Sequence, residues 1–410
     1  MKIGLLTQYY PVSDSARSLY SDLMDEISLF GHEITVFRSE EERVFGRPEV
    51  SSRKNVTIVS VPTGRVTKTN IMIKTANILL TEPRYLAAMK KYYADNYPDM
   101  VIITTPPITF CSAASYYRKK GSVIYLLLKD IFPQNAVDLG MMKKEGLIYS
   151  FFRAKERKLY KNSDVIGCMS EANKKYLLEH NLFLKNKKIE INPNSIKPSS
   201  SQIDAMQAEN LLDELKIPRG KIKIIYGGNL GKPQGIDFLL EVLDKSKEMK
   251  NVHFVICGNG TEYPKLEKFV KRHPDHPVTL IEYLENSRYR SLLSRMDIGL
   301  IFLDRRFTIP NFPQRVLDYF DFSLPVLAAT DKNTDLGSML VSKRCGLWSE
   351  SGDIYAFMKN LEYLVSNPEI RIEMGKNGRA LLDSEFSVSR SAELIIYQLN
   401  FKSSLKLKYY

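Results

Sequence analysis

The sequence predicts an α/β protein made of two successive series of buried parallel strands and helices. Short apolar runs alternate with helical patterns along the chain, and the runs lack the strict polar alternation of a half-exposed strand. A length of 410 residues is too great for one ordinary core. Residues 191–202, INPNSIKPSSSQ, are rich in Pro, Asn and Ser and separate the two series. We therefore expect two Rossmann-like domains facing across a cleft.

The elements follow from the apolar runs in chain order. The strands expected in the first series are residues 2–7, 33–37, 56–61, 100–105, 122–128, 164–169 and 188–192. Those expected in the second series are residues 221–228, 252–258, 278–283, 297–303, 325–329 and 345–348. A last helical pattern, from about 386 to 402, precedes a basic tail. The expected domains are residues 1–195, residues 196–385, and a C-terminal helix and tail, 386–410, that packs back toward the N-terminal domain.

Most of the net positive charge lies in the first half of the chain. The net charge is +12, and residues 1–195 hold 29 Lys and Arg against 20 Asp and Glu. Residues 65–93 and 140–161 mix Lys and Arg with Met, Ile, Leu, Phe and Tyr at roughly helical spacing. Each is either a core-packing helix with a solvated basic face or an interfacial helix resting on anionic lipid. A nucleic-acid partner is not expected, because no recognised nucleic-acid motif accompanies the charge.

Several classes of site are not expected. The 4 cysteines lie far apart and the 5 histidines form no ligand set, so we expect neither a disulfide framework nor a metal site. The sequence shows no Walker ending, no third Rossmann glycine and no nucleophile elbow. No run approaches about 18 uncharged apolar residues, and the opening MKIGLLTQYYP lacks the apolar segment of a signal peptide. We expect a soluble or peripheral cytoplasmic protein.

Ligands of open parallel sheets bind beyond the C-terminal ends of the strands, so the segments that follow the strands are the candidates. The segment IIYGGNLGKPQGIDFLL reads as a strand, a glycine turn and a helix, which together make an anion cradle. The cradle is short of fixed charge, because Lys232 is accompanied by the neutral Asn229 and Gln234. Further along, Gly258 and Gly260 form either a second binding turn or a tight connection.

Three charged side chains near strand ends or helix starts are further candidates. A helix expected to begin near Gln314 would present the backbone N–H groups of residues 314–317 to an anion, with Arg315 beside them. Asp318 could accept two hydroxyls of a sugar ring or simply complement the helix dipole. Asp130 ends an apolar strand, so it could orient a reacting hydroxyl, accept its proton, or cap a helix.

Several of these segments resemble one enzyme family in order and spacing. The opening MKIGLLTQYYPVSDSARSLYSDLMDEISLFGHEITVF, the turn INPNSI, and the segments IIYGGNLGKPQGIDFLLEVL, FVICGNGTEYPKLE and PVLAAT resemble the retaining glycosyltransferases of family 4, which have the GT-B fold. Two other segments resemble a bacterial L-fucosaminyltransferase-like subgroup of capsule and O-antigen assembly. They are DIFPQNAVDLGMMKKEGLIYSFFRAKERKLYKNSDVIGCMSEANKKYL and DRRFTIPNFPQRVLDYF. The resemblance covers nearly the whole chain.

The resemblance implies that the second domain holds a nucleotide-diphosphate sugar and the first domain holds the acceptor. It also implies front-face attack, in which the leaving phosphate accepts the proton of the acceptor without a metal, a cofactor or a protein nucleophile. The family typically carries two glutamates separated by seven residues. Asp318 takes the second position, whereas Pro310 takes the first, so the first acidic role is missing or moved.

A second departure concerns the charge that faces the diphosphate. Asn229 and Gln234 stand where many family members carry an arginine and a lysine. Neutral amides donate hydrogen bonds but do not neutralise a leaving group that carries roughly two to three negative charges. We therefore hypothesise that Arg315 supplies the main positive charge and Lys232 the second, since arginine binds phosphate in bidentate geometry.

The expected site combines these residues with the positions that the resemblance implies. We expect catalytic roles for Asp130, Arg315 and Asp318. The expected substrate-binding residues are Ser13, Arg17, Gly228, Asn229, Lys232, Gln234, Gly258, Asn259, Gly260, Glu262, Tyr283, Leu284, Asn311, Phe312, Gln314 and Val316. The nucleobase is expected near residues 258–262 and 281–284.

The function expected from the resemblance is transfer of an N-acetylated aminodeoxysugar to a polyprenyl-diphosphate-linked saccharide. The expected donor is the UDP form of N-acetyl-L-fucosamine, and the protein would lie at the inner face of the membrane. Two alternatives stay open, namely a family 4 enzyme with another nucleotide sugar and a non-catalytic sugar-nucleotide-binding paralogue. The sequence leaves the oligomeric state open.

Overall fold

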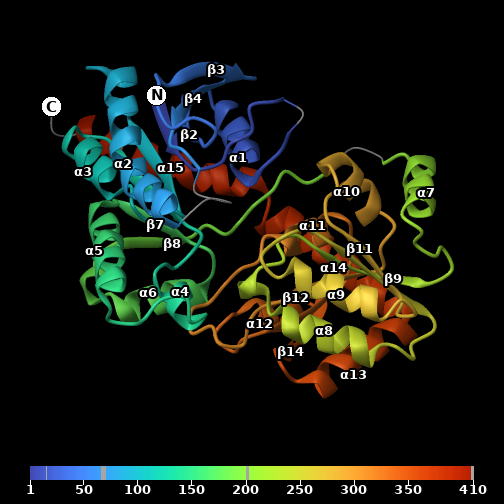
Figure 1. Ribbon diagram of the computed structural model, residues 1–410. Helices are drawn as coiled ribbons and strands as arrows, with labels where there is room; N and C mark the ends of the chain where they lie inside the picture. The colour runs from blue at the N-terminus through green and yellow to red at the C-terminus, as the bar shows by residue number, and fades with distance from the viewer. Residues whose placement is uncertain (15, 66–70, 200–202, 408–410) are drawn as a thin grey trace. The chain divides into compact units, whose positions relative to one another are not determined.

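The computed structural model describes residues 1–14, 16–65, 71–199 and 203–407 (Figure 1). Residues 66–70 of the expected basic helix and residues 200–202 of the expected linker lie outside the described residues. The chain divides into two compact units. Unit 1 is Met1–Lys197 with Val388–Tyr410, and unit 2 is Pro198–Ser387. Sequence analysis placed these two boundaries at 195/196 and 385/386.

Unit 1 contains an eight-stranded sheet in the order β3-β4-β2-β1-β5-β6-β7-β8. Its strands are β1 (Lys2–Leu6), β2 (Glu33–Glu40), β3 (Glu49–Arg53), β4 (Val56–Pro62), β5 (Met100–Thr104), β6 (Val123–Leu128), β7 (Val165–Cys168) and β8 (Lys188–Ile191). The strands expected in the first series are confirmed as parallel neighbours. Sequence analysis missed β3, an antiparallel edge strand. Its sequence EVSSR is exposed except at Arg53, so it lacks the apolar run that marks a buried strand.

Helices cover both faces of this sheet. They are α1 (Leu19–Ser28), α2 (Ile71–Tyr93), α3 (Cys111–Lys119), α4 (Gln134–Asp138), α5 (Leu147–Asn162), α6 (Glu171–His180) and α15 (Val388–Leu407), with the short η1 (Leu182–Leu184). Residues of α2, α3, α5 and α6 share one core with the sheet, and residues of α1 and α15 share the other. Tyr85 and Met89 of α2 are fully buried, so this part of the basic segment packs on the core.

The C-terminal helix α15 belongs to unit 1 although the rest of the second half of the chain forms unit 2. It lies beside α1, and Figure 1 shows the two helices (red and blue) in contact. Ala392 and Ile395 of α15 are fully buried in the core that also contains Ile27 of α1. The backbone N–H of Val388 donates to the carbonyl of Ile196, which ties the start of α15 to the end of the first series.

Unit 2 contains a six-stranded sheet in the order β11-β10-β9-β12-β13-β14, in which each pair of neighbours is parallel. The strands are β9 (Ile222–Gly227), β10 (Val252–Cys257), β11 (Val278–Ile281), β12 (Ile298–Phe302), β13 (Val326–Thr330) and β14 (Gly346–Glu350). Its helices are α7 (Ala205–Glu214), η2 (Lys232–Gln234), α8 (Ile236–Lys245), α9 (Tyr263–Arg272), α10 (Asn286–Leu293), α11 (Arg315–Asp321), α12 (Leu336–Ser342), α13 (Ile354–Ser366) and α14 (Pro368–Glu385). The strands expected in the second series are confirmed.

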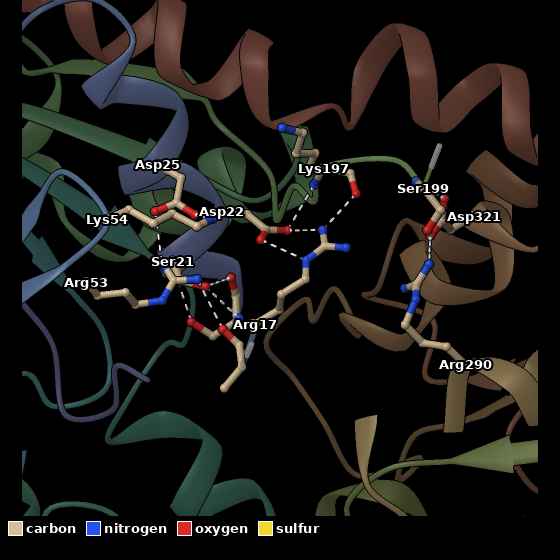
Figure 2. Close-up of polar contacts among 12 residues, drawn as sticks. Arg17, Ser21, Asp22, Asp25, Arg53, Lys54, Lys197, Ser199, Arg290 and Asp321 are labelled. Carbon is tan, nitrogen blue, oxygen red and sulfur yellow. Dashed lines mark hydrogen bonds and ion pairs between the residues drawn. The ribbon is translucent and has the colours of Figure 1, made fainter. Parts of the chain in front are cut away.

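Buried carboxylates hold the residues at the boundary between the units (Figure 2). In unit 1, the carboxylate of Asp22 accepts hydrogen bonds from the Arg17 guanidinium and from the backbone N–H of Lys197. In unit 2, the carboxylate of Asp321 accepts from both the backbone N–H and the hydroxyl of Ser199, at 2.8 and 2.7 Å. The last residue of α11 thus anchors the point at which the chain enters unit 2.

Candidate functional site

The strand order of unit 2 reverses between β9 and β12, which are neighbours in space but not in sequence. In open α/β sheets, ligands bind at such a switch point, outside the carboxyl ends of the strands. The two segments that leave these strands are residues 228–235, which contain the sequence GNLGKPQG, and residues 303–314, which lead into α11. The candidate site of unit 2 is therefore built from the segment after β9 (the β9 loop, residues 228–235) and the start of α11.

Arg315, the first residue of α11, brings its positive charge to the β9 loop. Its guanidinium carbon lies 4.3 Å from the centroid of the Tyr226 ring. A Cβ added to Gly228 would lie 3.4 Å from Nη2 of Arg315, and the φ of +121° at Gly228 also favours glycine. The Nη1 nitrogen of Arg315 is buried and has no hydrogen-bond partner among the described residues. The structure therefore brings together the loop and the arginine that sequence analysis paired from the family resemblance and the missing loop charge.

The β9 loop is not an open cradle of unpaired amides. The N–H groups of Gly228 and Leu230 donate to carbonyl oxygens of residues 257–259, at 2.9 and 2.8 Å. The N–H of Gly231 donates to the side-chain oxygen of Gln234 at 3.2 Å. The expectation that these amides are available to an anion is therefore wrong for three of the residues 228–231. Their partners lie on the neighbouring strand end or within the loop, and neither set of bonds is visible in the sequence.

The two glycines after β10 allow that close packing of the loops. A Cβ on Gly258 would lie 1.8 Å from the carbonyl oxygen of Gly228, and a Cβ on Gly260 would lie 2.4 Å from that of Leu230. Real side chains do not approach a backbone oxygen so closely. Of the two interpretations that the sequence left open, the tight connection is therefore present, and a binding role for these glycines stays a prediction.

The neutral amides of the β9 loop bond to each other. The side-chain oxygen of Gln234 accepts from the Asn229 amide at 3.2 Å as well as from the Gly231 backbone. Lys232 lies on the exposed side of the loop. Rotation of the Gln234 side chain would therefore free the N–H of Gly231, whereas the N–H groups of Gly228 and Leu230 are bonded to backbone carbonyls.

The start of α11 also differs from the expectation. The N–H groups of Val316 and Leu317 donate to the carbonyl oxygens of Pro313 and Gln314, at 3.3 and 2.9 Å, so two of the four amides expected to face an anion are already bonded. The Val316 side chain is fully buried. It therefore offers a substrate no side-chain surface.

The residues that lead into α11 are held by unit 2 itself. The Asn311 backbone N–H donates to the hydroxyl of Thr334 at 3.1 Å. Phe312 is buried, and its ring stacks on Phe386 with the centroids 5.3 Å apart. Its predicted role in binding can therefore run only through its backbone.

Asp318 lies in the first turn of α11, partly exposed, beside buried tyrosines. Burial, then the neighbouring Tyr319 and Asp318, hold the pKa of Tyr289 well above its ordinary value. The hydroxyl of Tyr319 accepts from the backbone N–H of Gly227 at 3.1 Å and lies 3.1 Å from the carbonyl of Leu300, so the helix is fixed to both β9 and β12. The catalytic role of Asp318 stays a prediction.

The residues expected at the nucleobase lie at the ends of the paired strands β10 and β11. The side-chain amide of Asn259 donates to the Glu282 carboxylate at 2.7 Å. Glu262 is mostly buried and pairs with Lys265 at 2.6 Å. Tyr283 is 76% exposed, so its ring is available to a ligand. Leu284 is partly exposed beside it.

Asp130 follows β6 in unit 1 and is fixed on two sides. The Asn135 amide lies 2.8 Å from each carboxylate oxygen, and the hydroxyl oxygen of Thr105 accepts from the backbone N–H groups of Lys129 and Asp130. Burial raises the pKa of Asp130 to about 6. The interpretation as a helix cap is not supported, because the N-cap of α4 is Pro133 and no side chain caps it.

Sequence analysis missed Lys129, which precedes Asp130. Its ammonium donates to the carbonyl of Asn192 at 2.8 Å, and burial lowers its pKa to about 7. A lysine that ends a run of six buried strand residues was the available signal. The switch point of unit 1, between β1 and β5, lies next to β6 in the sheet. Lys129 and Asp130 are thus a partly buried pair of titratable groups near the place where this sheet would bind a ligand.

Ser13 and Arg17, the two substrate-binding residues expected after β1, form hydrogen bonds within unit 1. The Arg17 guanidinium bonds to Asp22 and donates to the Lys197 carbonyl at 2.9 Å, and the Ser13 carbonyl accepts from the buried Arg53 (Figure 2). These bonds hold the loop after β1 and the chain at Lys197, and a substrate-binding role for Ser13 and Arg17 stays a prediction.

Across the described ranges, no group of three or more His, Cys, Asp or Glu residues is arranged to hold a metal ion. None of the helices described is long and apolar enough to cross a membrane.

Comparison with known proteins finds a family similarity within unit 2. Residues 207–381 match the family model "Glycosyl transferases group 1". The chain is 22% identical over 246 residues to the putative colanic acid biosynthesis glycosyl transferase WcaI of Escherichia coli (strain K12), covering 59% of this chain and 60% of that protein. It is 23% identical over 224 residues to the probable glycosyltransferase WbjE of Pseudomonas aeruginosa, covering 52% and 53%. The matches thus span little more than half of these relatives.

Solved structures show the same fold over the whole chain. Sucrose-phosphate synthase from Thermosynechococcus elongatus has a TM-score of 0.77 at 14% identity, with 98% of this chain and 99% of that chain covered. WaaG, a glycosyltransferase involved in lipopolysaccharide biosynthesis, has a TM-score of 0.66 at 15% identity, with 96% and 99% covered. The chain therefore has the GT-B fold of two Rossmann-like units, and its residues 207–381 are similar to the glycosyl transferases group 1 family.

Proposed function

We propose that the chain is a retaining glycosyltransferase whose unit 2 binds a nucleotide-diphosphate sugar at the β9 loop. The observation that carries the proposal is the Arg315 guanidinium, stacked on Tyr226 and placed against Gly228 with one buried nitrogen unpaired. A diphosphate is the ligand whose charge such a group complements. The match of this unit to a glycosyl transferase family supports the choice of a sugar nucleotide.

In this proposal Arg315 stabilises the charge that develops on the leaving diphosphate. The buried Nη1 donates to a phosphate oxygen, where the low dielectric strengthens the interaction. The Gln234 side chain turns away from Gly231, which frees a backbone N–H for the same diphosphate. The exposed Lys232 adds a weaker, solvent-screened charge.

Asp130 orients the hydroxyl of the acceptor in unit 1. With its pKa at about 6, the carboxylate is mostly ionised at pH 7, and Asn135 fixes its direction. The leaving phosphate takes the proton of the acceptor, so Asp130 need not act as an obligatory base. No metal and no cofactor enter this scheme.

The proposed substrates follow the L-fucosaminyltransferase-like segments of the sequence. The donor is the UDP form of N-acetyl-L-fucosamine, and the acceptor is a polyprenyl-diphosphate-linked saccharide of capsule or O-antigen assembly. The name of the Escherichia coli relative, which refers to colanic acid biosynthesis, supports an envelope polysaccharide. The proposed location is cytoplasmic, peripheral at the inner face of the membrane. A different nucleotide sugar is the alternative within the same reaction class.

A second candidate is a non-catalytic sugar-nucleotide-binding protein, which the proline at the first acidic position, Pro310, favours. Release of UDP from the UDP-sugar, measured with and without a lipid-linked acceptor, separates the two. The proposal expects release that depends on the acceptor. Tight binding of the UDP-sugar with no acceptor-dependent release would instead identify a binding protein.

A further inference from the structure

We infer that helix α5 of unit 1 is a membrane-docking element, in which apolar side chains of its first turns enter an anionic lipid surface and cations further along bind lipid phosphates. The inference deepens the proposed function by naming the surface that meets the membrane. The inference rests on the proposed function in one respect: a lipid-linked acceptor is what would bring the protein to a membrane. The contacts that support the inference all belong to unit 1, whereas the proposed donor site belongs to unit 2.

The start of α5 exposes a cluster of large apolar side chains. Leu147 is 92% exposed, Ile148 65% and Phe151 41%, and Met141 in the preceding loop is also exposed. Leu147 and Phe151 are four residues apart and Ile148 and Phe151 three, so these side chains share one face of the helix. Single exposed apolar residues are ordinary, but a contiguous cluster at a helix end marks an interaction site.

The side of α5 next to this apolar cluster is cationic in the following turns. A groove with a volume of about 550 Å³ runs along it, and the charged side chains that line the groove are all basic. They are Arg153, Arg157, Lys158 and Lys161. The one acidic residue of α5, Glu156, points inward, where it is buried and bonded to Arg153 and Tyr160. The charge of Arg153 is therefore compensated by Glu156, and Arg157, Lys158 and Lys161 supply the positive charge of the outward side.

An aromatic side chain from η1 supports the cations at the far end of the groove. Arg157 and Lys161 lie over the Phe183 ring, 5.4 and 5.3 Å from its centroid. Phe183 and its neighbour Leu182 are themselves exposed, which extends the apolar surface beside the cations. Long basic side chains that lie along apolar surface keep their charged ends at a lipid–water boundary. This arrangement fits an interface with apolar and anionic layers.

Charge and chain continuity both select an anionic lipid surface as the occupant. A lipid surface meets both the apolar start of α5 and its uninterrupted basic face, whereas a second copy would bring two basic faces together. Exposed Lys143 and Lys144 precede the helix and add to the charge. The segment that leads into α5 begins at Asp130, the proposed acceptor residue. Docking through α5 would therefore hold the acceptor site close to a lipid-linked saccharide.

Binding of the full chain to vesicles tests the inference. We expect the unchanged protein to float with vesicles of phosphatidylglycerol and phosphatidylcholine at low salt, and not with phosphatidylcholine alone. The double variant Leu147→Ser with Ile148→Ser should bind at least about tenfold more weakly. Arg157→Glu with Lys158→Glu should weaken binding at least about thirtyfold, and added salt should abolish the residual preference for the anionic lipid.

Two matched controls keep the comparison fair. Ile372→Ser removes an apolar side chain of similar exposure from α14 of unit 2, and Lys175→Glu reverses an exposed lysine of α6. Both should bind vesicles like the unchanged protein. Each variant should keep its melting temperature and its stabilisation by the donor, so a loss of docking is distinct from a failure of the proposed function. Equal vesicle binding by all variants, no binding by the unchanged protein, or a dimer that α5 variants dissociate would overturn the inference.

Discussion

Replacement of Arg315 by alanine should weaken UDP affinity and turnover far more than replacement of Lys232. Arg315 places Nη2 beside Gly228 and holds a buried Nη1 that has no hydrogen-bond partner among the described residues, whereas Lys232 is exposed. Loss of one donor to a developing oxyanion in a water-excluded site costs about 10²–10³ in rate. An exposed charge contributes about 1 kcal/mol or less, which corresponds to roughly fivefold or less. The two variants should therefore differ by at least about tenfold.

The stability of the Arg315→Ala protein can be judged from the contact between Arg315 and the Tyr226 ring. The variant loses the stacking on Tyr226, which contributes about 1 kcal/mol. The melting temperature of unit 2 should fall by only about 2–4 °C, so the protein stays folded during the assay.

The assay is calorimetric titration with UDP, followed by acceptor-dependent UDP release from the donor. Lys232→Ala serves as the matched control, because it removes one cation from the same loop region. Equal and mild losses in the two variants, or a larger loss for Lys232→Ala, would refute the assignment of the main charge to Arg315.

Three further predictions concern the charge of the β9 loop, the buried Asp321 of α11 and the proposed acceptor residue Asp130. Adding Gln234→Lys to the Arg315→Ala protein should recover up to about fivefold in UDP affinity by restoring a loop cation, and no recovery would show that loop charge is not limiting. Asp321→Ala should lower the free energy of unfolding by about 3–5 kcal/mol, because it removes a fully buried carboxylate from the partly exposed Arg290 and Arg379. Asp383→Ala, at an exposed partner of Arg379, should cost under about 1 kcal/mol in chemical denaturation. Because the folded pKa of Asp130 is raised to about 6, acceptor turnover should fall as the pH drops through about 6, and Asp130→Asn should lose that limb of the pH profile.

The magnitude for Asp321 follows from its surroundings. The side chain is fully buried and accepts hydrogen bonds from Ser199 and Arg290 (Figure 2). It also accepts from Arg379. These contacts bind α11, α10, α14 and the entry of the chain into unit 2. A hydrophobic core residue of similar size would not reproduce such a set of bonds.

The sheets were predictable because a strand that is buried on both faces is a continuous apolar run in the sequence. The runs that predicted β1 and β9, for example, match the strands to within two residues at either end. β3 left no such run, since it is an exposed edge strand with Arg53 as its one buried residue. The helical pattern near 386 marked α15 correctly because its core face repeats at helical spacing.

The site was predictable in its residues but not in its hydrogen bonds. The family resemblance and the missing loop charge together pointed to Arg315, and the structure brings its guanidinium to the β9 loop. The occupied amides of Gly228 and Leu230 were missed, because their acceptors belong to the next strand end and arise from sheet register. Lys129 was missed because a lysine beside a strand is usually solvated, and only its burial shows that its charge is perturbed.

Thermal unfolding with a panel of nucleotide sugars tests most directly the claim that the β9 loop and Arg315 hold a nucleotide-diphosphate sugar. The account predicts stabilisation by UDP-sugars, largest for UDP-N-acetyl-L-fucosamine, and about 2.7 kcal/mol at a ligand concentration 100 times the dissociation constant. The same UDP-sugars should stabilise the Arg315→Ala protein far less. Stabilisation by no nucleotide sugar, or equal stabilisation of the unchanged and Arg315→Ala proteins, would contradict the account.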